Sequence, residues 1–230
     1  MTKIFVTSTG TETGKTLITC ALLKHYRNLG KNVIPLKPII SGFNFAETPN
    51  DISLICQSAD MQYQSEIIAE ISKYIYSLPL SPDMAAQKEG KSYPQIEEIE
   101  DFINSKNNYD IKIIEGAGGL MVPFNKTEKT IDLIEETADE VILVAGSYLG
   151  SLSHTLSAYE VLKDRKVKVK AIFVSQKLQN NDELYIDLED TAKSLENFIS
   201  EPIIKIPYMD SNFDNKTNKL KEIISNVGIF

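Results

Sequence analysis

Cysteine and histidine are scarce in this chain of 230 residues. It has two of each, Cys20, Cys56, His25 and His154, and neither pair has the close spacing of zinc-ligand pairs. We therefore interpret the cysteines as reduced thiols of a cytosolic protein, with Cys20 in the core of a helix. We expect His25 on a helix surface and His154 packed or capping a helix, and neither has the surroundings of a general base.

Long apolar runs and an excess of positive charge are also missing. No segment reaches the roughly 18 apolar residues of a membrane span, and the N-terminal MTKIFVTSTG lacks the charged-then-apolar pattern of a signal peptide. The 24 Lys and Arg residues face 32 Asp and Glu, a net charge of −8, whereas nucleic-acid binding usually has a basic footprint. These absences predict a soluble, cytoplasmic protein that binds neither nucleic acid nor membranes.

The remaining composition is that of a globular protein, 42% hydrophobic and 24% charged, which excludes a mainly disordered chain. Short β-branched segments alternate with helical patterns. The predicted strands are Lys3–Thr7, Asn32–Leu36, Ile111–Glu115, Glu140–Ala145, Lys168–Val174 and Ile203–Ile206. The predicted helices are Lys15–Leu29, Asp51–Ala59, Ile67–Tyr76, Ser81–Gly90, Gln95–Asn104, Ile131–Thr137, Leu152–Lys163, Leu188–Phe198 and Leu220–Asn226.

This alternation predicts an α/β protein with a mainly parallel sheet covered by helices on both faces. The length fits a single domain over residues 1–230. Pro35 places the second strand at a sheet edge or strand end. The polar stretch Gln176–Glu183 is expected to form an exposed loop.

The strongest functional signal is Gly10–Thr16 (GTETGKT), between the first strand and the first helix. In a phosphate-binding loop, glycines let backbone N–H groups turn toward phosphate oxygens, and the helix N-terminus adds partial positive charge. Lys15 would supply a cation and the Thr16 hydroxyl a ligand for Mg²⁺. The spacing departs from G-x-x-x-x-G-K-[ST], because Thr9 occupies the first glycine position and Gly10 follows one residue later.

Two more motifs follow predicted strands, where a parallel sheet presents its ligand crevice. Lys37–Gly42 (KPIISG) would aim Lys37 at the phosphates and offer the Ser41 hydroxyl. Glu115–Gly119 (EGAGG) places an acid that can hold Mg²⁺ beside glycines that admit a ligand. Asp51 is either a further metal-facing carboxylate or a helix N-cap, and by itself fits the cap better.

Gly150–His154 (GSLSH) opens a predicted helix after another strand. Its free N–H groups and serine hydroxyls suit a substrate carboxylate. Simple helix capping explains the same residues equally well, so the spacing leaves both interpretations open.

Together these motifs make the chain resemble the ATP-dependent dethiobiotin synthetases over nearly its whole length. The resemblance rests on Val6–Thr16, Lys37–Gly42, Asn50–Leu54 (NDISL), Ser81–Gly90 (SPDMAAQKEG), Glu115–Pro123 (EGAGGLMVP), Gly150–Thr155 (GSLSHT) and Ile206–Met209 (IPYM), in this order. It implies a homodimeric, three-layer P-loop NTPase fold with a seven-stranded, mainly parallel sheet.

The reaction implied by this resemblance closes the ureido ring of dethiobiotin in biotin biosynthesis. The substrates are ATP, with Mg²⁺, 7,8-diaminopelargonic acid (7,8-diaminononanoate), and CO2 or bicarbonate. A carbamate forms on one amine and attacks the γ-phosphate of ATP to give a carbamic-phosphoric anhydride. The second amine then closes the ring and releases phosphate.

The resemblance also implies roles for individual residues. The catalytic residues would be Lys37, Lys15 and Thr11. The nucleotide would contact Glu12, Thr13, Gly14, Lys15, Thr16, Leu17, Asp51, Glu115, Gly116, Ala117, Gly118, Ser175, Gln176, Ile206, Pro207 and Tyr208. Mg²⁺ would be held by Thr16, Asp51 and Glu115. The diamine substrate would contact Ser41 and, across the dimer interface, Gly150, Ser151, Leu152 and Ser153.

Three positions depart from the family pattern. Ser8 stands where the family often has glycine, and Asp83 replaces a histidine. The family's adenine-reading Ala-Asn is absent, and the chain instead has Ser175 and Gln176, whose amide can serve in a similar way.

Alternative classes of nucleotide-binding protein require other sequence features. A partitioning or cell-division-positioning ATPase carries an extra lysine early in its phosphate loop, which is absent from Ser8–Thr13, and the C-terminal NKLKEII is too short and too weakly basic for a membrane helix. A cobyrinate-diamide type of ligase needs a glutaminase domain with a nucleophilic cysteine. A nucleotide-binding module without turnover is the remaining alternative.

Overall fold

The structure is a computed structural model that describes residues 1–176 and 186–230. Its strands are β1 (Thr2–Ser8), β2 (Val33–Leu36), β3 (Ile39–Ile40), β4 (Tyr74–Ile75), β5 (Ile111–Glu115), β6 (Glu140–Ser147), β7 (Val169–Gln176) and β8 (Ile203–Ile206). Its helices are α1 (Lys15–Asn28), α2 (Asp51–Ser58), α3 (Ser65–Ile71), α4 (Pro82–Glu89), α5 (Ile96–Asn104), α6 (Thr130–Thr137), α7 (Ser151–Asp164), α8 (Leu188–Glu196) and α9 (Phe213–Val227).

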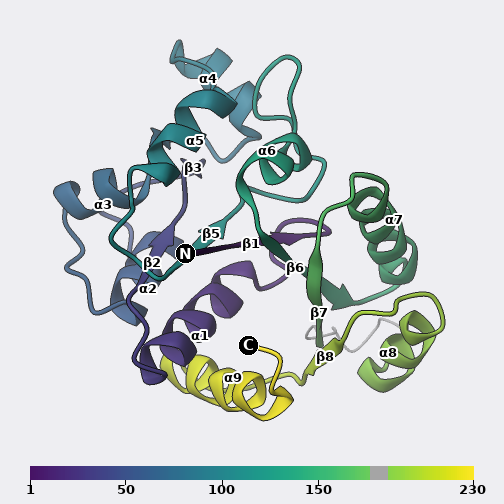
Figure 1. Cartoon of the computed structure of the whole chain (residues 1–230). Coiled ribbons are helices and arrows are strands. Elements are labelled where there is room, and N and C mark those ends of the chain that lie inside the picture. The colour runs from purple at the N-terminus through teal and green to yellow at the C-terminus, as the bar shows by residue number, and fades with distance from the viewer. Residues whose placement is uncertain (177–185) are drawn as a thin grey trace.

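The main sheet is parallel, with the strand order β2-β5-β1-β6-β7-β8 (Figure 1). It has six strands within the described residues, so the expectation of seven is wrong. The other two strands, β3 and β4, pair only with each other. Pro35 lies in the edge strand β2, as expected, because proline has no N–H to donate to a second neighbour.

Successive side chains of each strand point to opposite faces of the sheet, and both faces are apolar. Ile4 and Val6 of β1 pack in the core beneath α1, α2 and α9, whereas Phe5 packs in the core beneath α5, α6 and α7. Because both faces are covered, the central strands are almost continuously hydrophobic. The predicted layers of helices on both faces are therefore confirmed.

Three local expectations are wrong. The helix expected over Ile67–Tyr76 ends at Ile71, because Ser72 is extended and the chain continues into β4. The last helix begins at Phe213 rather than Leu220. His25 lies inside the α1–α9 interface and is 5% exposed, with its Nδ1 2.9 Å from Ser225 Oγ.

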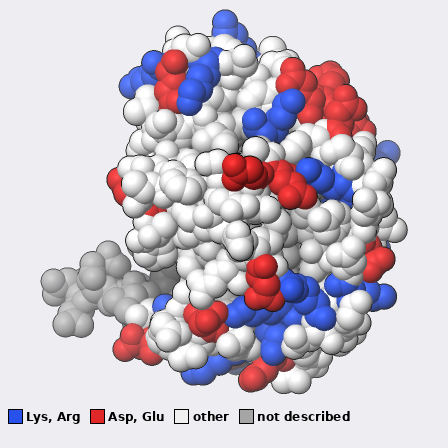
Figure 2. Space-filling view, turned by 90° about the vertical axis from the view of Figure 1, so that its left-hand side faces the viewer, with Lys and Arg blue, Asp and Glu red and all other residues white. Residues whose placement is uncertain are grey.

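Other expectations can be placed directly. Cys20 and Cys56 are free and buried. Residues 177–183 of the expected loop lie outside the described residues, and Gln176 is the last residue of β7. In the described part of the chain, no helix is long and apolar enough to cross a membrane. On the face drawn in Figure 2, acidic and basic side chains are interspersed.

Candidate active site

The loop between β1 and α1 has the backbone of a nest for anions. Gly14 precedes the helix with φ 101°, and Glu12 has φ 54°, so successive N–H groups turn inward at the N-terminus of α1. The Lys15 ammonium folds back over the loop, donating to Ser8 Oγ at 3.0 Å and to the Gly10 carbonyl at 3.3 Å. Burial lowers the pKa of Lys15 below its usual 10.5, although the charge of Glu115 opposes the shift.

The last glycine of the EGAGG motif, Gly119, packs against the phosphate-binding loop. A Cβ on Gly119 would lie 3.2 Å from the Cα and N of Gly10 and from the Ser8 carbonyl oxygen. The loop after β5 therefore rests directly on the phosphate-binding loop, backbone against backbone. Gly10 itself does not have a positive φ, and a Cβ there would meet no atom of the described residues within 4 Å, so the close approach requires glycine at position 119 and not at position 10.

A buried lysine joins two acids from different elements. Lys37 follows β2, is 6% exposed, and donates to Glu115 Oε1 at 2.9 Å and to Asp51 Oδ2. Burial alone lowers the pKa of a lysine, but the charges of Glu115 and Asp51 outweigh it and raise the pKa of Lys37 above its usual value. Lys37 therefore carries its charge at neutral pH.

Asp51 is not the helix cap that its position suggested. Asn50 is the N-cap of α2, with its side chain accepting from the Ser53 N–H at 2.9 Å in a capping box. Asp51 is the first helical residue and faces Lys37 instead. Burial raises a carboxyl pKa, but the adjacent Lys37 charge outweighs this and lowers the pKa of Asp51.

The donor atoms near Lys37 fit a magnesium ion. Glu115 Oε2 is buried and has no hydrogen-bond partner among the described residues, while Thr16 Oγ1 donates to Glu115 Oε1 at 2.9 Å. Across the described residues, no three His, Cys, Asp or Glu side chains form a metal cage. Mg²⁺ usually takes only one or two carboxylates and completes its shell with water and phosphate oxygens, so a hydroxyl and two acids are a suitable set.

These groups open into a cleft of about 860 Å³. Its walls come from the phosphate-binding loop, the start of α2, the loop after β5 and the segment before α4. The lining residues are Thr11, Glu12, Gly14, Lys15, Thr16, Leu17, Lys37, Ser41, Asp51, Leu54, Pro79, Leu80, Ser81, Pro82, Gly116, Ala117, Gly118, Val122 and Phe213. Ser41 Oγ is buried and has no hydrogen-bond partner within residues 1–176 and 186–230, so its hydroxyl is available to a substrate in this cleft.

A second cavity of about 190 Å³ adjoins the first and shares Glu12, Gly14 and Leu17 with it. It contains all five residues expected around the base, namely Ser175, Gln176, Ile206, Pro207 and Tyr208. The sequence interpretation missed two further lining residues, Met209 and Lys216. Met209 stands in the IPYM motif and so had a signal, whereas Lys216 lies in a polar stretch without one.

The turn before α7 does not line either cavity. Gly150 precedes the helix with φ 93°, and no side-chain cap is formed there, so the capping interpretation of the serines is wrong. Ser151 Oγ is buried without a partner, whereas Leu152 is exposed. His154 is exposed and its Nδ1 lies 2.9 Å from Tyr148 Oη.

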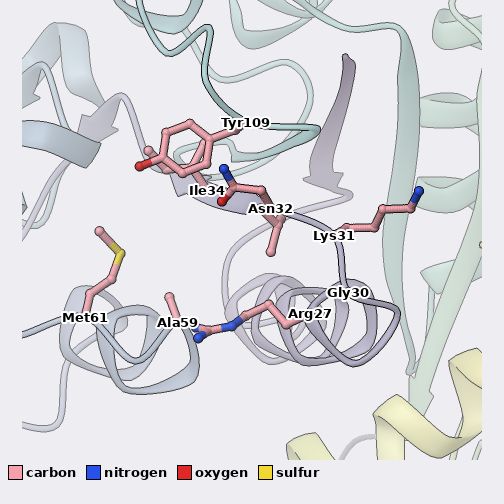
Figure 3. A pocket seen from close by; sticks show the side chains of 9 residues that line it. Arg27, Gly30, Lys31, Asn32, Ile34, Ala59, Met61 and Tyr109 are labelled. Atoms are coloured by element: carbon pink, nitrogen blue, oxygen red, sulfur yellow. The ribbon is translucent and has the colours of Figure 1, made fainter.

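A third cavity, of about 470 Å³, lies near the N-terminal ends of β2 and β5. Figure 3 shows the side chains that line it. Asn32 and Tyr109 precede strands there, and Arg27 and Met61 come from the ends of the helix segments beside them. Arg27 is paired with Asp60 at 2.8 Å. None of the predicted catalytic, nucleotide-binding, substrate-binding or metal-binding residues is among the described residues that line this cavity. The ligand crevice of a parallel sheet lies at the carboxyl ends of the strands instead.

Solved structures at low sequence identity share the fold. The septum site-determining protein MinD of Pyrococcus horikoshii matches with a TM-score of 0.58 and 16% identity, over 99% of this chain and 98% of that chain. A ParA family ATPase of Chlorobium tepidum matches with a TM-score of 0.54, also at 16% identity, over 98% and 91%. At such identity the likeness establishes the fold alone, including the P-loop arrangement.

Sequence comparison is more specific. The family model for an AAA domain matches residues 2–212. The ATP-dependent dethiobiotin synthetase BioD of Caulobacter sp. (strain K31) is 35% identical over 92% of this chain and 90% of its own length. The synthetase of Caulobacter vibrioides is 39% identical over 79% and 83%, and that of Legionella pneumophila 33% over 89% and 92%. The chain belongs to the ATP-dependent dethiobiotin synthetase family.

Proposed function

We propose that the protein closes the ureido ring of dethiobiotin from 7,8-diaminopelargonic acid, CO2 or bicarbonate, and ATP. The observation that carries this function is the position of Lys37. Its buried ammonium lies between Glu115 and Asp51, in the same cleft as the phosphate-binding loop and Ser41. A phosphoryl group transferred there would meet a fixed cation rather than water, which is the largest catalytic effect available to this chemistry.

Different residues of the cleft would act on the substrate and on the phosphates. Thr11 and Ser41 line the cleft and would contact the carbamate and the diamine. Lys15 and Lys37 would stabilise the charge on the γ-phosphoryl as the carbamate oxygen attacks it and ADP leaves. The second amine would then attack the carbamate carbon, forming the ring and releasing phosphate. Bound Mg²⁺, held by Thr16, Asp51 and Glu115, would neutralise negative charge on the phosphates.

The same proposal includes a cytoplasmic homodimer. Cys20 and Cys56 are free and buried, which suits a reducing compartment. The turn from Gly150 to Ser153 is outside both cavities of one protomer, so it would reach the substrate carboxylate only from a second protomer.

The test is ATP consumption by the purified protein with Mg²⁺ and bicarbonate, with and without 7,8-diaminopelargonic acid. We expect turnover that requires the diamine and yields dethiobiotin by mass spectrometry. Lys37→Gln, which still donates hydrogen bonds but carries no charge, should lower kcat by about 10²–10³. Lys88→Gln, an exposed lysine on α4, is the matched control and should leave kcat unchanged.

Nucleotide binding without diamine-dependent turnover would contradict the proposed reaction. Full activity of a folded Lys37→Gln variant would contradict the role of this lysine alone. ATP hydrolysis that responds to DNA or lipid vesicles instead of the diamine would favour a positioning ATPase.

A further inference from the structure

The N-terminal turn of α9 forms a wall of both connected cavities. Phe213, its first residue, lines the larger cleft, and Lys216, one turn later, lines the smaller cavity. Residues three apart on a helix lie on the same side. One helix face therefore overlooks the path from the phosphate-binding loop to the pocket around Tyr208.

This turn is held in place by a lysine of α1. The Lys24 ammonium contacts Asp214 Oδ1 at 2.8 Å, Thr217 Oγ1 at 2.9 Å and Asn218 Oδ1 at 3.3 Å. Asn212 caps the helix, its side chain accepting from the Asn215 N–H at 2.9 Å. These contacts lie on the side of α9 that faces α1. They hold the helix in place and so also fix the positions of Phe213 and Lys216, which lie on a neighbouring side of it.

Lys216 differs from the other two lysines that line these cavities. Lys15 and Lys37 have hydrogen-bond partners in the loop and in the acids. Lys216 is partly buried, and no residue of the ranges 1–176 and 186–230 forms a hydrogen bond or ion pair with its ammonium. Glu12 is the one acid among the described residues that line this cavity, and it forms no ion pair with Lys216. The Lys216 ammonium can therefore donate to an acceptor that a ligand in this cavity supplies.

We propose that Lys216 is a nucleotide-binding residue that donates a hydrogen bond to the nucleoside half of the nucleotide. This inference rests on the proposed use of ATP. The triphosphate would lie on the loop from Glu12 to Thr16, and the residues shared by both cavities lead the sugar and base into the smaller one. Lys216 lines this smaller cavity together with Tyr208, and the acceptors that a nucleotide would place there are sugar oxygens and base nitrogens.

Calorimetric binding of Mg·ATP and of inorganic tripolyphosphate to the same variants tests the assignment. Lys216→Ala should weaken ATP binding about tenfold, the loss expected for one hydrogen bond from a charged group, and leave tripolyphosphate binding unchanged. Lys216→Arg should restore most of the ATP affinity. Lys219→Ala, an exposed lysine on the same helix, is the matched control and should change neither affinity. In turnover, Lys216→Ala should raise KM for ATP and leave kcat unchanged.

Unchanged ATP affinity in Lys216→Ala would overturn the assignment. An equal loss of ATP and tripolyphosphate affinity would also overturn it, because Lys216 would then act on the phosphates. These outcomes are separate from the proposed reaction: if the wild type binds ATP and fails to convert the diamine, the binding series still decides the role of Lys216.

Discussion

The contact between Gly119 and Gly10 shows how single residues hold the two ligand loops together. The loop after β5 carries Glu115, and the loop after β1 carries the phosphate-binding nest. Both strands are parallel neighbours in the sheet, so their loops emerge side by side. Because Gly119 has no side chain, the backbones of the two loops come into contact. This contact fixes the position of Glu115 relative to Thr16.

Gly119→Ala should therefore push the two loops apart. We expect a loss of about 1–3 kcal/mol in the free energy of unfolding, the usual cost of overpacking, measured by urea denaturation, with weaker ATP binding. Gly10→Ala is the matched control, because a Cβ there meets no atom within 4 Å. It should stay within about 0.5 kcal/mol of the wild type. Equal losses in both variants would contradict this account of the contact.

For single residues, the sequence predicted which side chains meet in the cleft where their positions follow from the ends of the strands. Lys15, Thr16, Lys37 and Glu115 all come directly after parallel strands or open the first helix, so they had to converge. Lys216 could not be found in this way. It lines the cavity because α9 packs on α1, where Lys24 contacts Asp214 and Thr217, and this pairing joins segments far apart in the chain.

The packing of α9 on α1 makes His25 a buried group between two helices. Its Nδ1 contacts Ser225 Oγ, and its Nε2 is buried without a hydrogen-bond partner among the described side chains. Burial lowers the pKa of His25, and the nearby Lys221 charge adds to this, against a smaller opposite effect of the Phe230 backbone. The imidazole is therefore neutral in the folded protein at neutral pH.

This shift predicts how the stability of the helix pair depends on pH. The unfolded chain takes up the proton near pH 6.5 and the folded chain only at lower pH, so acidification through pH 6.5 favours unfolding. Between pH 7.5 and 5.5 the wild type should lose more unfolding free energy than His25→Gln, measured by urea denaturation at each pH. His154→Gln, which changes the exposed second histidine, should behave as the wild type does. An identical pH slope for the wild type and His25→Gln would contradict this prediction.

Helices and strands could be predicted where apolar residues recur with the spacing of a helix or a strand. The strands β5 and β8 begin and end at the predicted residues. The first turns of α9 are polar (FDNKTNK), so their helical pattern becomes visible only where Thr217 and Leu220 meet α1. The pair β3–β4 was missed because two-residue strands have no period, and Tyr74 and Ile75 equally suit the end of a helix.

At the scale of the whole molecule, fold and function come from different features. The sheet order and helix layers are shared with MinD and ParA proteins at 16% identity, so the architecture alone does not distinguish a ligase from a positioning ATPase. The sequence identity to the synthetases makes that distinction. In the proposed function the turn from Gly150 to Ser153 would hold the substrate carboxylate, although it lines neither of the two connected cavities in the described part of one protomer.

A homodimer that places this turn over the partner's cleft would bury Leu149, which is 79% exposed in one protomer. Leu149→Asp should therefore weaken the dimer, as followed by analytical ultracentrifugation, and raise KM for the diamine tenfold or more through loss of hydrogen bonds to the carboxylate. The rise should shrink at high protein concentration, because mass action restores the dimer. Phe198→Asp, a change at another exposed apolar residue (66%), should leave both unchanged. A monomeric Leu149→Asp protein with the wild-type KM would mean that each protomer binds the carboxylate by itself.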